Sequence, residues 1–243
     1  MLYIQKEPAL PSVAQELNRI KRDYNWDSVD YTETQRVRMV FDTLDKKMIR
    51  HQLVREQKGL CAYCMRRIRD DENTTIEHLI PISQNGRAAL DYENMLACCD
   101  GGRRSNDTNR VLCCDASKKE TEIHTSPYNR EQMAKIRYDK YGFLLVPPEE
   151  TEMLLDINEV LKLNGVQDAE GRFLHDTSTR LVYSRKQAYE KYRKYIIGLG
   201  KKGKPITSAI KRRIKEIDEA PEREEFAGVL LFFLNRKLRA KQS

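Results

Sequence analysis

Long apolar runs are absent from this chain of 243 residues, since none approaches the roughly 20 residues that a membrane span requires. The longest, at 227–234, is bracketed by charged residues, which is typical of a buried helix. The first residues lack the basic region and following apolar stretch of a secretory signal. We therefore expect a cytoplasmic protein that contacts no membrane. In a reducing cytosol, thiols persist as metal ligands, buried groups or nucleophiles and seldom form disulfides.

Cysteine is missing from most of the chain. All six cysteines lie within residues 61–119, together with one of the four histidines. This segment has few apolar residues, no long periodic stretch and several turn signals, such as Asn85-Gly86 and Gly101-Gly102. With so little apolar content the segment needs an additional source of folding free energy, which a bound metal ion can supply. We expect residues 61–119 to be a metal-stapled unit around which the rest of the chain is organised.

The spacing of the cysteines is typical of zinc ligands. Cys61 and Cys64 form a Cys-x-x-Cys motif, which places two thiolates on one tight turn, the usual half of a tetrahedral zinc site. The second half must come from the adjacent pairs 98/99 and 113/114. Neighbouring side chains point apart, so we expect one cysteine of each pair to bind and the other to pack, and the residues alone leave that choice open. A redox-active Cys-x-x-Cys is the lesser alternative, because the βαβ context of such a motif is missing.

A Glu-His pair lies between these cysteines. Residues 74–81 alternate like a short strand, so we expect Glu77 and His78 to point to opposite faces unless the strand bends. An isolated Glu-His pair indicates little by itself. It becomes informative because Asn94 follows sixteen residues after His78, and a Cys-Asp-x-x-Lys motif containing Asp115 comes after that.

Positive charge predominates, with a net charge of +7 and a pI near 9.0, which weakly favours contact with a polyanion. The charge is concentrated in residues 172–216, where 14 Lys and Arg face 3 Asp and Glu, a net +11, with four interleaved tyrosines. Nucleic-acid contact and a solvated helical face with inward tyrosines are equally expected there. We interpret His51 as an ordinary surface residue and assign no function to His175.

Outside the metal-stapled unit the pattern is mainly helical. We predict helices at 12–22, 32–58, 149–163, 177–199, 206–219 and 222–238, and a β-hairpin at 136–146. The stretch 226–234 is too apolar for a solvated helix, so we expect it to pack on the core or on another chain.

Together the central motifs resemble the HNH nucleases. The zinc-stapled ββα-metal members of that class follow the pattern Cys-x-x-Cys, Asp/Glu-His-x-x-Pro, Asn-x-x-x-x-Cys and Cys-His/Asn/Asp-x-x-Lys, and each element is present here in order. The resemblance selects Cys99, five residues after Asn94, and Cys114, directly before Asp115. This chain departs from it in the longer insertion between Cys99 and Cys114, and in Asp115, where His or Asn is commoner.

The resemblance implies an α+β fold in which a zinc-stapled ββα-metal HNH core is embedded in a mainly helical protein. The regions would be a helical segment at 1–59, the nuclease core at 60–125, and a hairpin with a mainly helical, basic region at 126–243. A structural zinc ion would be bound by Cys61, Cys64, Cys99 and Cys114.

The resemblance also implies catalytic roles. His78 would be the general base that takes a proton from water, and Asn94 would orient its ring through a hydrogen bond. Glu77 and Asp115 would hold one divalent ion and leave positions open for the scissile phosphate. The chemistry agrees, because an imidazole with a pKa of about 6.5 is a suitable base at neutral pH. Two carboxylates favour Mg²⁺ or Mn²⁺, while thiolates favour zinc.

A narrower resemblance covers more of the chain. Leu60-Cys-Ala-Tyr-Cys64, Leu90-Asp-Tyr-Glu-Asn94 and Leu161-Lys-Leu-Asn-Gly165, with the first six residues, are similar to the HNH subunit of Septu-type anti-phage systems, also found as a retron effector. It implies an effector endonuclease with DNA favoured over RNA or tRNA. The implied partners are an ABC-type ATPase and, in the retron setting, a reverse transcriptase with its DNA–RNA product. The alternative is a non-catalytic zinc module that binds nucleic acid or a partner, which would need only the cysteines.

Overall fold

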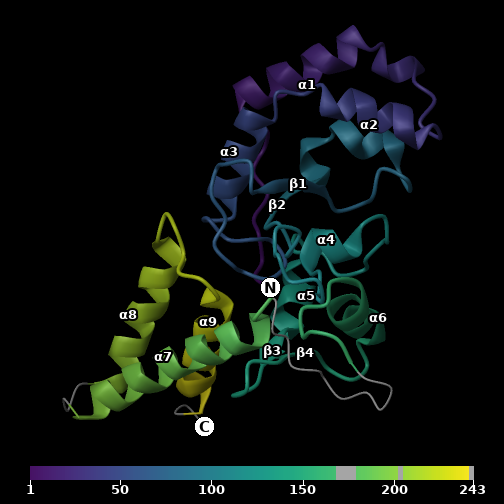
Figure 1. The fold of residues 1–243 in the computed structure, drawn as a ribbon. Helices are drawn as coiled ribbons and strands as arrows, with labels where there is room; N and C mark the ends of the chain where they lie inside the picture. Colours follow the sequence, from purple (N-terminus) through teal and green to yellow (C-terminus); the bar gives the residue numbers. More distant parts are fainter. Residues whose placement is uncertain (168–178, 202–204, 241–243) are drawn as a thin grey trace.

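The computed structural model describes residues 1–167, 179–201 and 205–240, and the fold is α+β and mainly helical, as predicted (Figure 1). Two separate antiparallel sheets of two strands each, β1–β2 and β3–β4, lie among the helices. Within these residues no helix has both the length and the apolar character to span a membrane. Apolar side chains from the beginning, middle and end of the chain share one buried cluster.

The first part of the chain is helical. It contains α1 (Pro11–Asp23), the 3-10 turn η1 (Trp26–Ser28), α2 (Thr34–Asp42) and α3 (Lys46–Glu56). The helix predicted at 12–22 is confirmed, but the single helix predicted at 32–58 is wrong. The Asp45 side chain accepts a hydrogen bond from the Lys47 backbone N–H at 3.0 Å and so caps a new helix. The apolar periodicity therefore continues across two helices that a cap separates.

The centre of the molecule is a ββα arrangement. It consists of β1 (Thr75–His78), β2 (Met95–Cys98) and α4 (Cys114–Lys118), with the 3-10 turns η2 (Gly86–Leu90) and η3 (Tyr92–Asn94) between the strands. The strands pair antiparallel, with Thr75 opposite Cys98 and His78 opposite Met95. The predicted short strand is confirmed, and its pairing places the Glu-His pair beside the chain that leads into Cys99.

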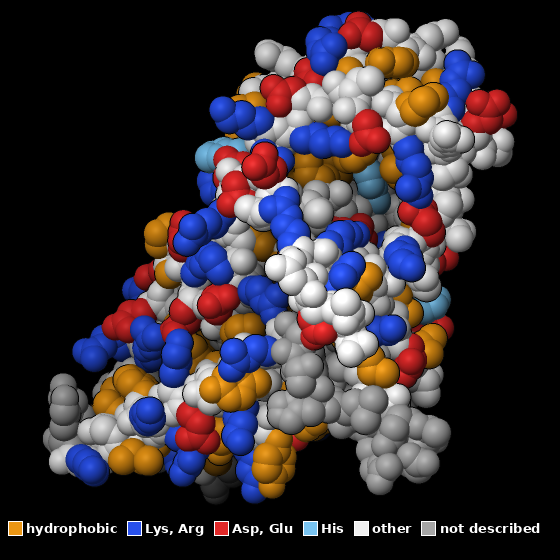
Figure 2. All heavy atoms as spheres, viewed as in Figure 1, with side chains coloured by type: hydrophobic (Ala, Val, Ile, Leu, Met, Phe, Trp, Pro, Cys, Tyr) orange, Lys and Arg blue, Asp and Glu red, His pale blue; other side chains and the backbone are white. Residues whose placement is uncertain are grey.

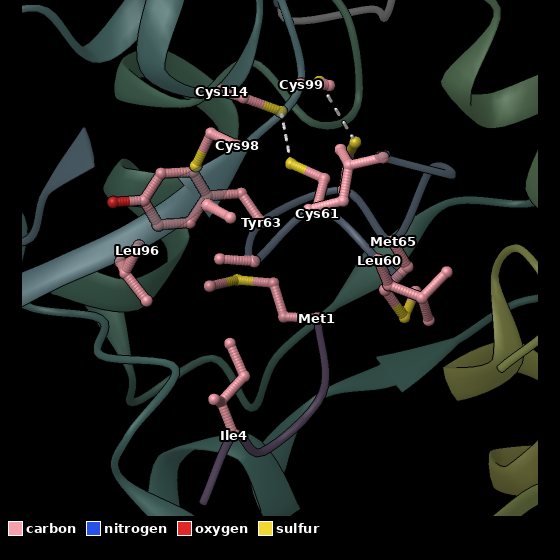
Figure 3. Close-up of a cluster of buried hydrophobic side chains, with 14 of the residues drawn as sticks. Met1, Ile4, Leu60, Cys61, Tyr63, Met65, Leu96, Cys98, Cys99 and Cys114 are labelled. Atoms are coloured by element: carbon pink, nitrogen blue, oxygen red, sulfur yellow. Dashed lines mark hydrogen bonds between the residues drawn. The ribbon is translucent and has the colours of Figure 1, made fainter. Parts of the chain in front are cut away.

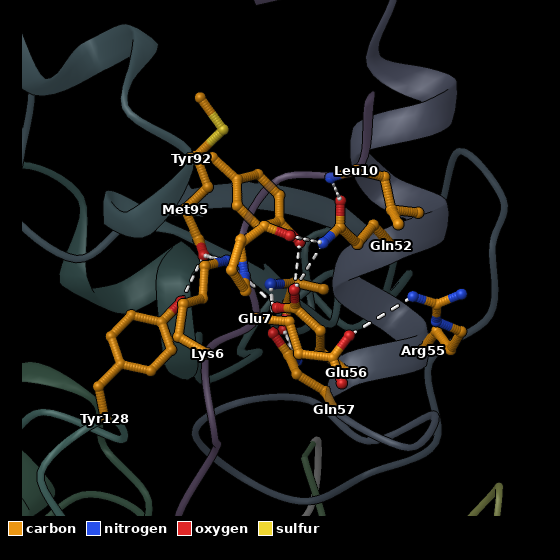
Figure 4. Close-up of polar contacts among 12 residues, drawn as sticks. Lys6, Glu7, Leu10, Gln52, Arg55, Glu56, Gln57, Tyr92, Met95 and Tyr128 are labelled. Carbon is orange, nitrogen blue, oxygen red and sulfur yellow. Dashed lines mark hydrogen bonds and ion pairs between the residues drawn. The ribbon is translucent and has the colours of Figure 1, made fainter. Parts of the chain in front are cut away.

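A buried polar network fastens the first residues and α3 to this unit (Figure 4). The Lys6 ammonium lies 3.1 Å from the Met95 carbonyl oxygen, 3.3 Å from the Glu56 carboxylate and 3.5 Å from the centre of the Tyr92 ring. The Tyr92 hydroxyl donates to the same carboxylate at 2.7 Å. Burial lowers the pKa of Lys6 to about 8, although Glu56 opposes the shift. Each charge is thus held by a partner, and α3 is fixed against β2.

A hairpin and irregular helices follow the central unit. They are α5 (Arg130–Lys135), β3 (Arg137–Tyr138), β4 (Leu144–Leu145), α6 (Thr151–Leu155) and the π-helical turn η4 (Asp156–Val160). The hairpin predicted at 136–146 is confirmed. The helix predicted at 149–163 widens to a π-helix at Asp156, whose buried carboxylate accepts hydrogen bonds from the His124 and Thr125 backbone N–H groups at 2.8 and 2.7 Å.

Three long helices form the last part, α7 (Leu181–Lys201), α8 (Ile206–Glu219) and α9 (Ala227–Arg239). They correspond to the predicted helices, except that residues 177–178 lie outside the described ranges and α9 starts later than expected. α9 packs against α7 and α8, which confirms that the stretch 226–234 is buried. The rings of Tyr189 and Tyr192 lie 4.6 and 5.4 Å from the ring of Phe233. These two tyrosines therefore pack inward and are not displayed for stacking on bases.

The basic stretch 172–216 is described at 179–201 and 205–216. Figure 2 shows Lys and Arg side chains over α7 and α8, interspersed with acidic and apolar ones. Several are paired along their own helix, such as Arg193 with Glu190 at 2.9 Å and Arg212 with Glu216 at 3.4 Å. His175 lies outside the described residues.

Candidate active site and metal centre

Four cysteines converge where β2, α4 and the turn after α3 meet (Figure 3). Their sulfurs all lie within 4.8 Å of one another, and all four residues are buried. The Cys61 and Cys114 sulfurs are 3.9 Å apart, and those of Cys64 and Cys99 are 3.7 Å apart. A zinc ion bound tetrahedrally at about 2.3 Å requires sulfurs about 3.8 Å apart. This four-cysteine cluster is consistent with a structural zinc site.

A tight turn presents the first two sulfurs. The Cys61 backbone N–H donates to the Arg66 carbonyl at 2.9 Å, and the Met65 N–H donates to the Cys61 carbonyl at 3.1 Å. Met65 closes the turn in the left-handed region, with φ 64°. The Ala62 N–H donates to the Ala97 carbonyl at 3.1 Å. The turn is thereby attached to β2, and two sulfurs face the end of the strand that leads to the third.

The insertion before the last sulfur is closed at its base. Gly101 has φ +62°, and a Cβ atom there would lie 2.3 Å from the Cys113 carbonyl oxygen, so only glycine fits. The Cys113 N–H donates to the Gly101 carbonyl at 2.9 Å, and the Cys114 N–H donates to the Leu161 carbonyl at 2.9 Å. These two hydrogen bonds fix the backbone at Cys114 independently of the path of the long insertion.

The other two cysteines are buried outside the cluster. Figure 3 shows Cys98 beside the ring of Tyr63. Burial raises the pKa of the Cys98 thiol well above its usual value, so it stays protonated. Each adjacent pair is thus divided between one clustered and one packed cysteine, and the clustered members are those that the HNH pattern selects, Cys99 and Cys114. Cys113 is the packed member of its pair.

His78 ends β1, and its ring is buried. Nε2 lies 3.0 Å from the Ala89 carbonyl oxygen. A carbonyl can only accept, so Nε2 carries the proton and Nδ1 is the basic nitrogen. The Phe41 ring packs edge-on against the imidazole at 4.6 Å. Burial lowers the pKa of His78, assisted by the Lys118 charge and opposed by the hydrogen bond to Ala89. The ring is therefore neutral at pH 7 and fixed in one tautomer.

Asn94 does not hydrogen-bond the His78 ring, contrary to the prediction. Its Oδ1 accepts from the Ile80 N–H at 2.8 Å, while Nδ2 donates to the carbonyls of Ile80 at 3.0 Å and Ala88 at 3.3 Å. The amide bridges the chain leaving β1 to the turn η2. The next carbonyl along that turn, Ala89, accepts the hydrogen bond from the His78 Nε2–H, so Asn94 holds the backbone that orients the ring.

The side chains of Glu77, Asp115 and Lys118 lie together and form the candidate ion site. Glu77 Oε1 lies 2.7 Å from the Lys118 ammonium and 3.4 Å from the Tyr63 hydroxyl. Lys118 is wholly buried and also donates to the His78 carbonyl at 3.0 Å. Burial and the neighbouring Asp115 raise the pKa of Glu77 from its usual 4.5 to about 8, although Lys118 opposes the shift.

Asp115 is the ionised member of this pair. Its Oδ2 accepts from the Arg103 guanidinium at 2.8 Å and from the Thr75 hydroxyl at 3.2 Å. Burial by itself would raise the pKa of Asp115, but hydrogen bonds from Glu77 and Arg103 outweigh it and hold the pKa below its usual value. At pH 7 one proton therefore remains on the two carboxyl groups. A divalent cation can replace that proton, and oxygen donors of this kind suit a hard ion.

Two residues at the candidate ion site were not assigned a role from the sequence. Lys118 was visible as the last residue of the Cys-Asp-x-x-Lys motif, which gave it no role. Arg103 lies in the insertion, where no motif or periodicity distinguishes it from neighbouring arginines. His51 lies beside Asp70 and His124 lies beside Glu152. Both histidines are exposed and neither contacts the candidate ion site.

Residues 61–100 match the sequence model of a family described as HNH endonuclease. This part of the chain is therefore an HNH endonuclease domain, and such a domain implies a phosphodiester hydrolase with a nucleic-acid substrate and a divalent metal ion. The match includes Glu77, His78 and Asn94 but ends before Cys114 and Asp115. No curated protein matches the chain. These comparisons give no support for an association with Septu or retron systems.

Proposed function

We propose that the protein is a metal-dependent endonuclease in which His78 is the general base and Glu77 and Asp115 bind a single Mg²⁺ or Mn²⁺ ion. The observation that carries this proposal is the pair of adjoining carboxyl groups, one of which directly precedes a buried, neutral histidine of fixed tautomer in β1. A structural zinc module needs the four-cysteine cluster but has no use for this second constellation.

His78 would take the proton of the attacking water at Nδ1. Its Nε2–H stays on the Ala89 carbonyl, so the ring keeps its orientation while it becomes charged. The positive Lys118 opposes that charge, so the proton is readily passed on to solvent after each cycle. Asn94 acts through the backbone, because its amide fixes the turn that carries the Ala89 carbonyl.

Glu77 and Asp115 are the residues that would hold the divalent ion. The Lys118 ammonium holds the Glu77 carboxyl group in place, and the Thr75 hydroxyl, on β1, donates a hydrogen bond to Asp115. When bound, the ion stabilises negative charge on the scissile phosphate and on the leaving oxygen, an effect worth several kcal/mol. The four-cysteine cluster would bind zinc and fix the geometry from which Asp115 projects, one residue after Cys114.

The same proposal includes the organisation and partners of the chain. Residues 60–125 would be the nuclease core, flanked by a helical region at 1–59 and by a basic region at 126–243 that contacts substrate or a partner. As in the resemblance described above, the protein would be an effector of an anti-phage complex with an ABC-type ATPase, cutting DNA in preference to RNA or tRNA. The support is the sequence similarity outside the HNH segment and the basic surface of α7 and α8. Co-purification with the product of the neighbouring gene tests the partner.

The catalytic proposal is tested with zinc-loaded wild type, His78→Ala and the matched control His51→Ala, each given DNA and RNA with Mg²⁺ or Mn²⁺. Loss of a general base typically costs about 10²–10⁴-fold in rate. We expect that loss in His78→Ala, with unchanged zinc content and a lower Tm because a buried, packed ring is removed, and wild-type rates and Tm in His51→Ala. A zinc-bound wild type that cleaves neither polymer, with or without the partner, would favour the non-catalytic binding module instead.

A further inference from the structure

The insertion between the last two clustered cysteines carries three arginines that lie in different surroundings. The Arg103 guanidinium donates to the Asp115 carboxylate at 2.8 Å. Arg104 donates instead to the Glu72 carbonyl at 3.2 Å, and Arg110 to a backbone carbonyl within the insertion at 3.5 Å. Because Gly101 pins the base of the insertion against Cys113, the first arginine after it is held beside α4. One of the three is thus fixed on a carboxylate of the candidate ion site.

Two positive charges lie beside the candidate ion site before any metal ion binds. Two carboxyl groups, Glu77 and Asp115, face two cationic side chains, Lys118 and Arg103. Lys118 has a side-chain exposure of 0% and is held from two sides, by the Glu77 carboxyl group and the His78 carbonyl, so its departure would break two buried contacts. The Arg103 side chain is 42% exposed and reaches solvent from a loop. Of these two cations, Arg103 is the one that a divalent ion can displace.

We propose that Arg103 occupies Asp115 until the divalent ion binds and then moves to the scissile phosphate. The proposal rests on the proposed nuclease function. A planar guanidinium binds phosphate oxygens in pairs as readily as it binds a carboxylate. A group that already contacts a ligand carboxylate of the ion needs only a side-chain rotation to reach an anion held on the same ion. Arg103 would therefore be a phosphate-binding residue that leaves Asp115 only after the ion has bound.

The exchange at Asp115 is measured without any cleavage. Zinc-loaded wild type, Arg103→Ala and the control Arg110→Ala are titrated with Mn²⁺, and free Mn²⁺ is followed by electron paramagnetic resonance. Removing a competing ion pair of this exposure should tighten Mn²⁺ binding about three- to tenfold in Arg103→Ala. Arg110→Ala should bind like wild type. Unchanged or weaker Mn²⁺ binding by Arg103→Ala overturns the exchange.

The phosphate role is measured by turnover at saturating Mn²⁺, where occupancy of the ion site is equal in all variants. Removing one preorganised donor to a developing charge typically costs about 10²-fold, and we expect that loss in Arg103→Ala despite its tighter ion binding. Arg103→Lys keeps the charge without the paired donors, so its turnover should lie between those of wild type and Arg103→Ala. A wild-type turnover in Arg103→Ala overturns this role. If wild type itself cleaves nothing, the phosphate role fails with the proposed function, while the Mn²⁺ titration still decides the exchange.

Discussion

Binding of a divalent ion between Glu77 and Asp115 should release a proton at pH 7. In the ion-free protein the pKa of Glu77 is raised to about 8, chiefly by burial. Its carboxyl group is then about nine-tenths protonated at pH 7 and must ionise before it can bind a cation. Asp115 is already ionised, because its pKa is lowered. We therefore expect close to one proton released per ion bound.

The same shift sets a pH dependence of stability. The folded pKa of about 8 lies above the usual 4.5, so the stability that Glu77 contributes is complete below pH 4.5 and is lost as the pH rises through 8. Between pH 6 and 9 the Glu77 contribution should fall by about 3 kcal/mol, or about 5–10 °C in Tm, measured as the difference between wild type and Glu77→Gln, because the lowered pKa values of Lys6 and of the terminal amine act in the opposite direction in both proteins. Asp115 has the opposite sign and contributes stability above its usual 3.8, which is already complete at pH 6. Saturating Mn²⁺ should remove this contribution, because Glu77 then stays ionised.

Isothermal titration of zinc-loaded protein with Mn²⁺, in buffers of different ionisation enthalpy at pH 7, counts the released protons. Thermal unfolding at pH 6 and pH 9, with and without Mn²⁺, measures the slope. Glu77→Gln is the matched control, because the amide is nearly the same size and cannot ionise, so the Glu77 contribution should be absent from its pH dependence. Ion binding without proton uptake or release, or an equal pH slope in wild type and Glu77→Gln, would refute the assignment of the shared proton to this pair.

Three further predictions follow from the geometry. Replacing any member of the four-cysteine cluster by Ser should lower zinc content and soluble yield, whereas Cys98→Ser and Cys113→Ser should keep zinc; atomic absorption distinguishes them, and the opposite order would show that the wrong sulfurs were chosen. Asn94→Ala should lower the free energy of unfolding by about 1–3 kcal/mol, because it leaves buried backbone groups unpaired, and should slow cleavage less than His78→Ala; a rate loss as large as that of His78→Ala would contradict its indirect role. Charge reversal at 211–213 should weaken nucleic-acid or partner binding without changing zinc content, and unchanged binding in both assays would make α8 a merely solvated face.

The metal centre was readable from the sequence because its ligands obey fixed spacing. Cys61 and Cys64 lie on one turn, and the count from Asn94 to Cys99 reflects a strand of fixed rise, so motif and geometry select the same sulfurs. The helices at α8 and α9 were found for a similar reason, since apolar periodicity reports the buried face. At Asp45 that signal failed, because one helix ends and another begins there while the apolar pattern continues without interruption.

Contacts that depend on the path of a loop were beyond the sequence. The pattern identified Asn94 but could not show that its amide would bind the backbone of Ile80 and Ala88 in place of an imidazole. Arg103 was one arginine among several until the Gly101 turn placed it against Asp115. In both cases the side chain could form hydrogen bonds of similar strength with several partners. Only the three-dimensional course of the backbone determines which partner is within reach.

The hydrogen bonds around the four-cysteine cluster have a consequence for synthesis. All four sulfurs have left the ribosome once Cys114 is free, so zinc can be captured by a short nascent chain. The hydrogen bond from the Cys114 N–H, however, cannot form before Leu161 has been synthesised. The Met65 carbonyl likewise accepts a hydrogen bond, at 3.0 Å, from the N–H of Phe226, which is synthesised later still. Contacts between residues this distant in sequence form late in folding. The cell would therefore hold a zinc-loaded but incomplete nuclease during the later part of translation, and the centre would become rigid only when α9 docks beside the turn that carries Cys61 and Cys64.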